Sequence, residues 1–148
     1  MSAPAAEKEY VGGCHCGKFR FKFTNAPFED GAGTVDRCTC GFCTQKGALW
    51  LYVSSLYMFA LDTHVAIRRY MPERLFTLTS GSVEELTLYE FYKKVFRHYF
   101  CPTCGVQFFF KDVRGVHEES MVAVNARTVD GVDPEKLRVR VFDGATIL

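Results

Sequence analysis

This sequence lacks an excess of basic or of acidic residues, and that lack narrows the classes of ligand that the protein is expected to bind. Among 148 residues, 18 are basic and 17 acidic, so the formal net charge is +1, and neither sign forms a long run. Because phosphate backbones are bound by clustered lysine and arginine, the composition argues against nucleic acid as the main ligand. The sequence also has no phosphate-binding loop, no Ser, His and Asp in the order of a catalytic triad, and no paired-carboxylate motif. It therefore does not predict an activity that depends on any of these motifs.

Long apolar runs are missing as well. No stretch approaches the roughly 20 apolar residues that span a bilayer. The N-terminal MSAPAAEKEY has no apolar segment of the kind found in a secretory signal. We therefore expect a cytoplasmic protein with no membrane partner. Disulfides are rare in that compartment, so the seven cysteines favour metal binding.

What the sequence does contain is a repeated alternation of apolar and polar residues, which is the period of a half-buried strand. The pattern is clear in KFRFKFT at 18–24, where phenylalanine alternates with polar residues. The other predicted strands lie at 48–55, 65–71, 74–80, 85–92, 106–112, 120–128 and 137–143. One helical turn is predicted at 132–137, and YEFYKKVFRHYF at 89–100 fits either a strand or a short helix. We predict a flexible N-terminus at 1–9 and a single, antiparallel, mainly β domain over 10–148.

The seven cysteines stand in three clusters, all in predicted connections, and the first cluster lies ahead of the first predicted strand. We name them the first pair (Cys14 and Cys16, in CHCG), the middle cluster (Cys38, Cys40 and Cys43, in CTCGFC) and the knuckle (Cys101 and Cys104, in CPTCG). In the knuckle both sulfurs can face one ion, and the glycine that follows tolerates the positive φ of such a turn. A redox pair of the same spacing requires an α/β setting, which the strand pattern does not provide.

These clusters divide most simply into a group of four cysteines and a group of three. A structural zinc site is closed by four protein ligands, whereas a catalytic site keeps three and an open position. Pairing the knuckle with the first pair keeps every cluster whole and leaves the middle cluster as the group of three. The long sequence separation is no obstacle, because the cost of closing a loop grows only logarithmically with its length. Spacing alone does not exclude pairing the knuckle with two cysteines of the middle cluster.

Four segments together resemble the glutathione-dependent formaldehyde-activating enzyme family, which includes centromere protein V. They are GGCHCGKFRFKF (12–23), CTCGFCTQKGA (38–48), FCPTCGVQFFF (100–110) and VAVNARTVDGVDPEKL (122–137), in the family's order. The resemblance implies a mainly β, tent-like zinc-binding fold with two zinc ions. It implies a structural zinc on Cys14, Cys16, Cys101 and Cys104, and a catalytic zinc on Cys38, Cys40 and Cys43.

The middle cluster departs from the family's usual C-H-C-x-x-C motif. Thr39 stands where the family carries histidine, and Gly41 stands where it carries a small polar residue. The sulfur ligands are intact, so metal binding is expected to persist. The change bears on the identity of the substrate, because a histidine that could tune the site is replaced.

Three thiolates on zinc are better suited to holding an incoming thiol as a thiolate than to ionising water. The resemblance implies a carbon–sulfur lyase-type enzyme that joins glutathione and formaldehyde, giving S-hydroxymethylglutathione. The alternative function is a non-catalytic zinc-stabilised interaction module. The sequence itself assigns no substrate-contacting residue and no catalytic residue beyond the open metal site.

For several individual residues, the sequence allows a functional or a structural interpretation. His64 or His98 could close the middle cluster as a fourth ligand, which would make it a second structural site. His15 and His117 are predicted to lie at the surface. Asn125 either binds substrate or caps a turn, and the run Phe108–Phe110 is predicted to belong to the core.

Overall fold

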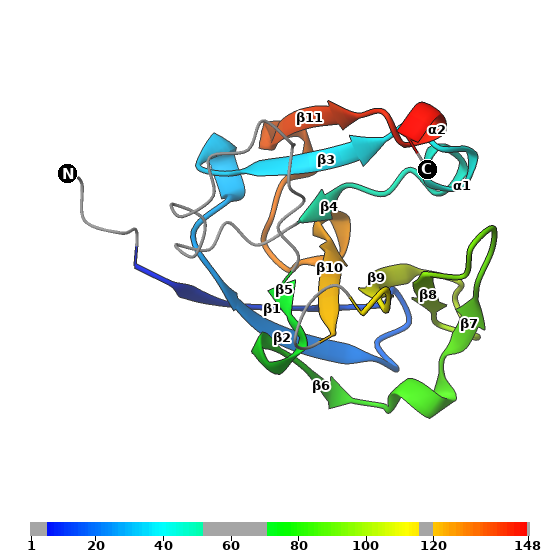
Figure 1. Cartoon of the computed structure of the whole chain (residues 1–148). Helices are drawn as coiled ribbons and strands as arrows, with labels where there is room; N and C mark the ends of the chain where they lie inside the picture. The colour runs from blue at the N-terminus through cyan, green and yellow to red at the C-terminus, as the bar shows by residue number, and fades with distance from the viewer. Residues whose placement is uncertain (1–5, 52–70, 116–119, 148) are drawn as a thin grey trace.

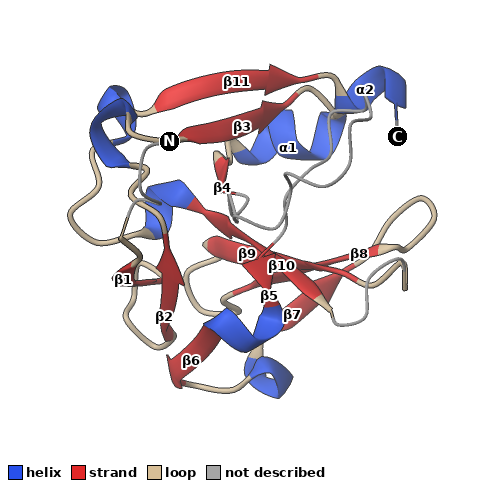
Figure 2. Ribbon diagram, turned by 60° about the vertical axis from the view of Figure 1, so that its left-hand side comes forward, coloured by secondary structure: helices blue, strands red, loops and turns tan. Residues whose placement is uncertain are grey.

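Two β-sheets form the framework of the protein (Figure 1, Figure 2). The computed structural model describes residues 6–51, 71–115 and 120–147. The smaller sheet has the order β1–β2–β6, and the larger has the order β11–β3–β4–β10–β9–β8–β7, with β5 paired to β10. The strands are β1 (Lys8–Gly13), β2 (Arg20–Asn25), β3 (Thr34–Cys38), β4 (Trp50–Leu51), β5 (Met71–Pro72), β6 (Phe76–Ser80), β7 (Thr87–Tyr89), β8 (Phe96–Phe100), β9 (Gln107–Asp112), β10 (Met121–Asn125) and β11 (Arg138–Phe142). The prediction of a mainly β fold is confirmed.

Among the residues that the structure describes, helical structure is limited to short segments. The α-helices are α1 (Gly41–Lys46) and α2 (Gly144–Ile147), and the 3-10 turns are η1 (Glu29–Gly31), η3 (Glu73–Leu75), η4 (Val83–Glu85), η5 (Ala126–Thr128) and η6 (Pro134–Lys136). The last of these is the single turn predicted at 132–137. Over the three described ranges, no helix has the length and apolar character needed to cross a membrane.

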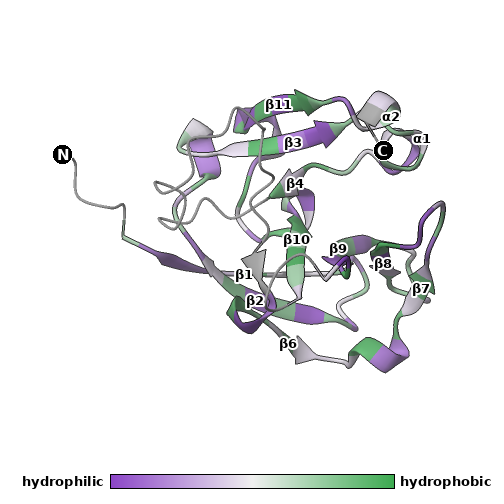
Figure 3. Ribbon diagram, in the orientation of Figure 1, coloured by the Kyte–Doolittle hydropathy of each residue, from purple (hydrophilic) through white to green (hydrophobic). Residues whose placement is uncertain are grey.

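A core rich in phenylalanine joins the two sheets. Phe21 and Phe23 lie on the buried face of β2, where the alternation of its sequence places them. The Phe108 ring of β9 stacks on Phe21 with a centroid distance of 5.5 Å. Phe108, Phe109 and Phe110 are all buried, which confirms their assignment to the core. Figure 3 shows the same character in β10, which is hydrophobic along much of its length at the centre of the larger sheet.

One pairing of the larger sheet differs from the predicted antiparallel arrangement. β11 runs parallel to β3, in a register from Arg138 opposite Thr34 to Phe142 opposite Cys38. Parallel neighbours need a crossover connection rather than a hairpin. All of the chain from α1 to η6, including β4 to β10, lies between β3 and β11 and forms that connection. β3, which leads into the middle cluster, is therefore held by the distant end of the sequence.

The positions of the cysteines also correct two expectations. β1 precedes Cys14, so the first pair lies between two strands instead of ahead of the first one. Cys38 is the last residue of β3 and Cys43 lies within α1, so the cysteines are not all in connections.

The ambiguous stretch 89–100 forms the end of β7, a turn and then β8. The predicted strand at 65–71, except Met71 of β5, and the second half of the one at 48–55 lie outside the described residues.

Candidate metal centres

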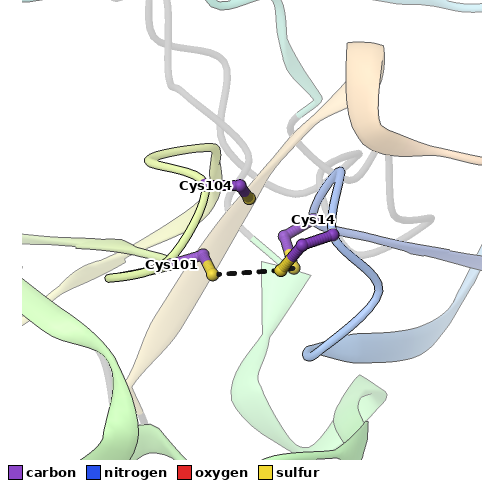
Figure 4. A group of neighbouring side chains, drawn as sticks. Cys14, Cys101 and Cys104 are labelled. Atoms are coloured by element: carbon purple, nitrogen blue, oxygen red, sulfur yellow. Dashed lines mark hydrogen bonds between the residues drawn. The ribbon is translucent and has the colours of Figure 1, made fainter.

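The knuckle and the first pair come together as one group of four cysteines. Their sulfur atoms all lie within 4.8 Å of one another. The Sγ atom of Cys16 lies 3.6 Å from the Sγ atoms of both Cys14 and Cys101. Figure 4 shows the sulfur atoms of the labelled cysteines turned toward one another, from the turn after β1 and from the turn between β8 and β9. This is the pairing that keeps the sequence clusters whole.

Backbone geometry explains why the knuckle points both sulfurs inward. Gly105 has a φ of +74°, and its N–H donates to the Cys101 carbonyl at 2.8 Å, which closes the turn. Burial raises the pKa of Cys104, but backbone hydrogen bonds from Cys16 and Val106 outweigh it, and the pKa falls to about 6. The turn therefore favours a thiolate, which is the form that binds metal. Four convergent sulfur atoms of this kind fit a closed site for a soft divalent ion such as zinc.

The middle cluster forms a second group, built on the start of a helix. The sulfur atoms of Cys38, Cys40 and Cys43 lie within 4.8 Å of one another. Cys40 is the N-cap of α1, and its sulfur accepts a hydrogen bond from the Cys43 N–H at 3.4 Å. Gly47 ends the helix in the left-handed conformation, with a φ of +66°. The end of β3, which carries Cys38, and the capped first turn of α1, which carries Cys40 and Cys43, thus bring three thiols together.

The buried side chain of Trp50 contacts this group through Cys43. Its Nε1–H donates to the Sγ atom of Cys43 at 3.4 Å, and the residue is 0% exposed. Hydrogen bonding with Cys38 and burial raise the pKa of the Cys43 thiol, and the Trp50 N–H opposes that rise. Trp50 stands in β4, between β3 and β10, so the sheet fixes the direction of its N–H. This residue was not predicted from the sequence, although the chain has no other tryptophan.

Comparison with known proteins places these two groups in a family. The family model described as glutathione-dependent formaldehyde-activating enzyme matches residues 9–142. The chain belongs to the glutathione-dependent formaldehyde-activating enzyme family. A protein of Rhodobacter sphaeroides, solved as a structural-genomics target, is similar in structure with a TM-score of 0.60 and 25% sequence identity. The match covers 88% of this chain and 99% of the other. The resemblance stated from the motifs is confirmed.

In this family member, His98 lies beside the middle cluster without joining it. The group of side chains within ligand distance contains no histidine among the residues that the structure describes, and His64 lies outside them. His98 is buried on β8, and its Nδ1 atom is 2.9 Å from the amide nitrogen of Gln107. Burial, and secondarily the charge of Lys46, lowers the pKa of His98 to about 4. The imidazole is therefore neutral near pH 7.

Thr39 and Gly41, the two departures from the family motif, have different environments. The Thr39 hydroxyl donates to the Asp143 carboxylate at 3.1 Å and accepts from the Ala145 N–H at 3.2 Å. It therefore ties α2 to the middle cluster, beside α1 (Figure 1). Gly41 begins α1, and a Cβ atom placed on it would meet nothing within 4 Å. The Thr39 side chain thus has a hydrogen-bonding role that links α2 to the middle cluster, whereas the position of Gly41 leaves room for a larger side chain.

Asn125 and two histidines complete the residues on which the sequence made a prediction. Asn125 caps η5, because its Oδ1 accepts from the Arg127 N–H at 3.3 Å while its amide donates to the Gln107 carbonyl at 2.9 Å. Of its two readings, the turn cap is confirmed. His15 is exposed, as predicted, and His117 lies outside the described residues.

Replacing Trp50 tests whether its N–H tunes the middle cluster. We expect Trp50→Phe to weaken metal binding at this group about tenfold, since hydrogen bonds to metal ligands contribute on that scale. A sulfur that loses an N–H donor becomes the better electron donor. The sulfur-to-metal charge-transfer band of the cobalt-substituted protein should therefore move to lower energy.

Phe110→Leu is the matched control for this substitution. The Phe110 ring meets Trp50 edge-on with a centroid distance of 4.6 Å, so its loss removes aromatic packing but leaves the N–H in place. An unchanged band in Trp50→Phe, or the same shift in Phe110→Leu, would contradict the role of the hydrogen bond.

Proposed function

We propose that this protein is a zinc-dependent carbon–sulfur lyase-type enzyme that joins glutathione to formaldehyde, giving S-hydroxymethylglutathione. The observation that carries the proposal is the division of seven cysteines into a group of four and a group of three. Membership of the glutathione-dependent formaldehyde-activating enzyme family supports the choice of both substrates. We further propose that the protein acts in the cytoplasm.

The two groups are assigned different roles. The first pair and the knuckle would hold a structural zinc with four sulfur ligands, and the middle cluster would hold a second zinc with three. Bound there, zinc would supply a Lewis acid that favours the thiolate form of an incoming thiol. The side chains around the middle cluster determine which molecules reach the metal position and from which direction they approach it.

The surroundings of the middle cluster restrict the approach to one side. Cys38 and Cys43 are 4% and 8% exposed and pack with Trp50 and Phe110, whereas Cys40 is partly exposed. A substrate thiol therefore approaches on the side of Cys40. The buried aromatic side chains keep water away from the opposite side, which strengthens electrostatic interactions within the site.

The reaction balances without a further cofactor. The thiol sulfur forms a bond to the carbonyl carbon, the carbon–oxygen π bond breaks, and the thiol proton ends on the oxygen. Neither an oxidant nor a reductant is consumed. The protein needs only to ionise the thiol, position the aldehyde and allow a proton to reach the oxygen.

Titration of the cobalt-substituted protein with glutathione tests the proposal. We expect the sulfur-to-metal charge-transfer absorption to grow as glutathione is added, with proton release near neutral pH, because a thiol of pKa about 8.5 must ionise to coordinate. S-methylglutathione, which lacks the ionisable group, should bind much more weakly and is the control ligand. A spectrum that stays unchanged at saturating glutathione would favour the non-catalytic interaction module instead.

A further inference from the structure

Three aromatic side chains form a continuous stack next to the middle cluster, which we call the aromatic shelf: Phe42, Tyr89 and Phe91. Phe42 lies in α1 between Cys40 and Cys43 and packs against the apolar cluster that contains Cys43. Its ring is 5.5 Å from Tyr89 and 5.1 Å from Phe91, measured between centroids, and Tyr89 is 5.6 Å from Phe91. Tyr89 is 46% exposed, so the shelf leads from the cysteines out to solvent.

Lys46 places a positive charge at this shelf. It follows Phe42 by four residues, so the two side chains share one face of α1. Its Nζ atom lies 5.9 Å from the ring centroid of Phe42 and 4.9 Å from that of Phe100, the residue before the knuckle. The same charge contributes to the low pKa of His98. Several independent contacts therefore place the ammonium group between α1 and β8.

No carboxylate balances this charge within the described part of the chain. Neighbouring cations have contacts of their own: Arg127 donates to the Gly47 carbonyl at 2.9 Å, Arg97 of β8 pairs with Glu90, and Lys93 lies over the Tyr92 ring in the β7–β8 turn. None of the six ion pairs seen in the described ranges includes Lys46. Lys46 is exposed, so its ammonium is open to an anion from solvent, while its contacts with the two rings hold it beside the shelf.

We propose that Lys46 binds a carboxylate of the thiol substrate, with the aromatic shelf beneath the ligand, so that the site selects thiols that carry a carboxylate. The inference rests on the proposed function, since it takes the middle cluster as the position of the thiol sulfur. Lys46 stands three residues after Cys43, which is about 4.5 Å of helical rise. Glutathione carries two carboxylates, each separated from its sulfur by one amide linkage, so it has the charge and a flexible reach that this arrangement requires.

Two pairs of ligands and one variant test the inference. Apparent Kd values are measured from the charge-transfer absorption of the cobalt-substituted protein, for glutathione and for the small thiols 3-mercaptopropionate and 2-mercaptoethanol. Lys46→Gln should raise the Kd for glutathione and for 3-mercaptopropionate about tenfold, while the Kd for neutral 2-mercaptoethanol changes less than twofold. Added salt should weaken carboxylate-thiol binding in the unmodified protein more than in the variant, because salt screens the ion pair.

Lys18→Gln is the matched control, because Lys18 also lies over an aromatic ring, 5.7 Å from the centroid of Phe19, but stands just ahead of β2 in the smaller sheet. It should leave all three Kd values unchanged. Equal Kd values for the unmodified protein and Lys46→Gln, or an equal loss for charged and neutral thiols, would overturn this inference alone. Absence of any thiol response in the unmodified protein would overturn the proposed function together with it.

Discussion

Cys104→Ser should lower the free energy of unfolding by about 4 kcal/mol, the range associated with loss of a structural metal, whereas Cys40→Ser should lower it far less. The sulfur of Cys104 belongs to the group that joins the turn after β1 to the turn between β8 and β9, so it links the smaller sheet to the larger one. A bound structural ion contributes its binding free energy to folding directly. Cys40 caps a six-residue helix near the edge of the larger sheet, and much less of the fold depends on it.

Urea unfolding and metal analysis separate the two variants. Cys40→Ser should retain one zinc ion of two and lose the spectral response to glutathione. Cys104→Ser should unfold at a much lower urea concentration. If the two substitutions destabilise the protein equally, the assignment of one structural and one catalytic group is wrong.

Arg140→Met should lower the free energy of unfolding by about 2 kcal/mol, less than the 3–5 kcal/mol typical of breaking a fully buried pair. Asp36 is 1% exposed on β3, and Arg140 of β11 donates to its two carboxylate oxygens at 2.8 and 2.9 Å. Removing the guanidinium leaves a buried carboxylate without its counter-charge. Because the Arg140 side chain is 55% exposed, water can enter the vacated space and reduce the cost.

A double variant shows whether the charge itself is responsible. Asp36→Val combined with Arg140→Met removes both partners and should be more stable than Arg140→Met alone, since no charge is then left buried. Arg138→Met, an exposed position in the same strand, is the control and should have little effect. Equal stability of the single and double variants would show that β11 is held to β3 by other contacts.

The strands could be predicted because alternation is a local property. The segments at 106–112 and 137–143 contain β9 and β11, and the segment at 18–24 covers β2 except its last residue. The direction of pairing could not be predicted in the same way, because a strand has a period of two whether its neighbour is parallel or antiparallel. α1 was missed since six residues are too few to show a helical period, and its signals are a cysteine cap and a final glycine.

The two cysteine groups could be predicted from the spacing of the cysteines in the sequence, but the residues that contact these groups could not. Cysteines that are close in sequence stay close in space. A division that keeps each sequence cluster whole therefore predicts which thiols come together. The hydrogen bond from Trp50 depends on how β4 lies between β3 and β10, which is a tertiary property. The position of Lys46 over Phe100 likewise depends on the packing of α1 against β8. For Trp50 the one usable signal was a lone tryptophan shortly after the middle cluster.

The long-range pairing of β3 with β11 has a consequence for biosynthesis. Asp36 and Arg140 are 104 residues apart, and Cys16 and Cys101 are 85 residues apart. When the first five cysteines leave the ribosome, the strand and the turn that complete their surroundings have not yet been translated. The nascent chain therefore carries unprotected thiols for most of its synthesis, and oxidation in that interval would remove the ligands before metal arrives. The group of four cysteines is complete only once Cys104 has been translated, whereas the three thiols of the middle cluster emerge together, well before the β11 strand that pairs with β3.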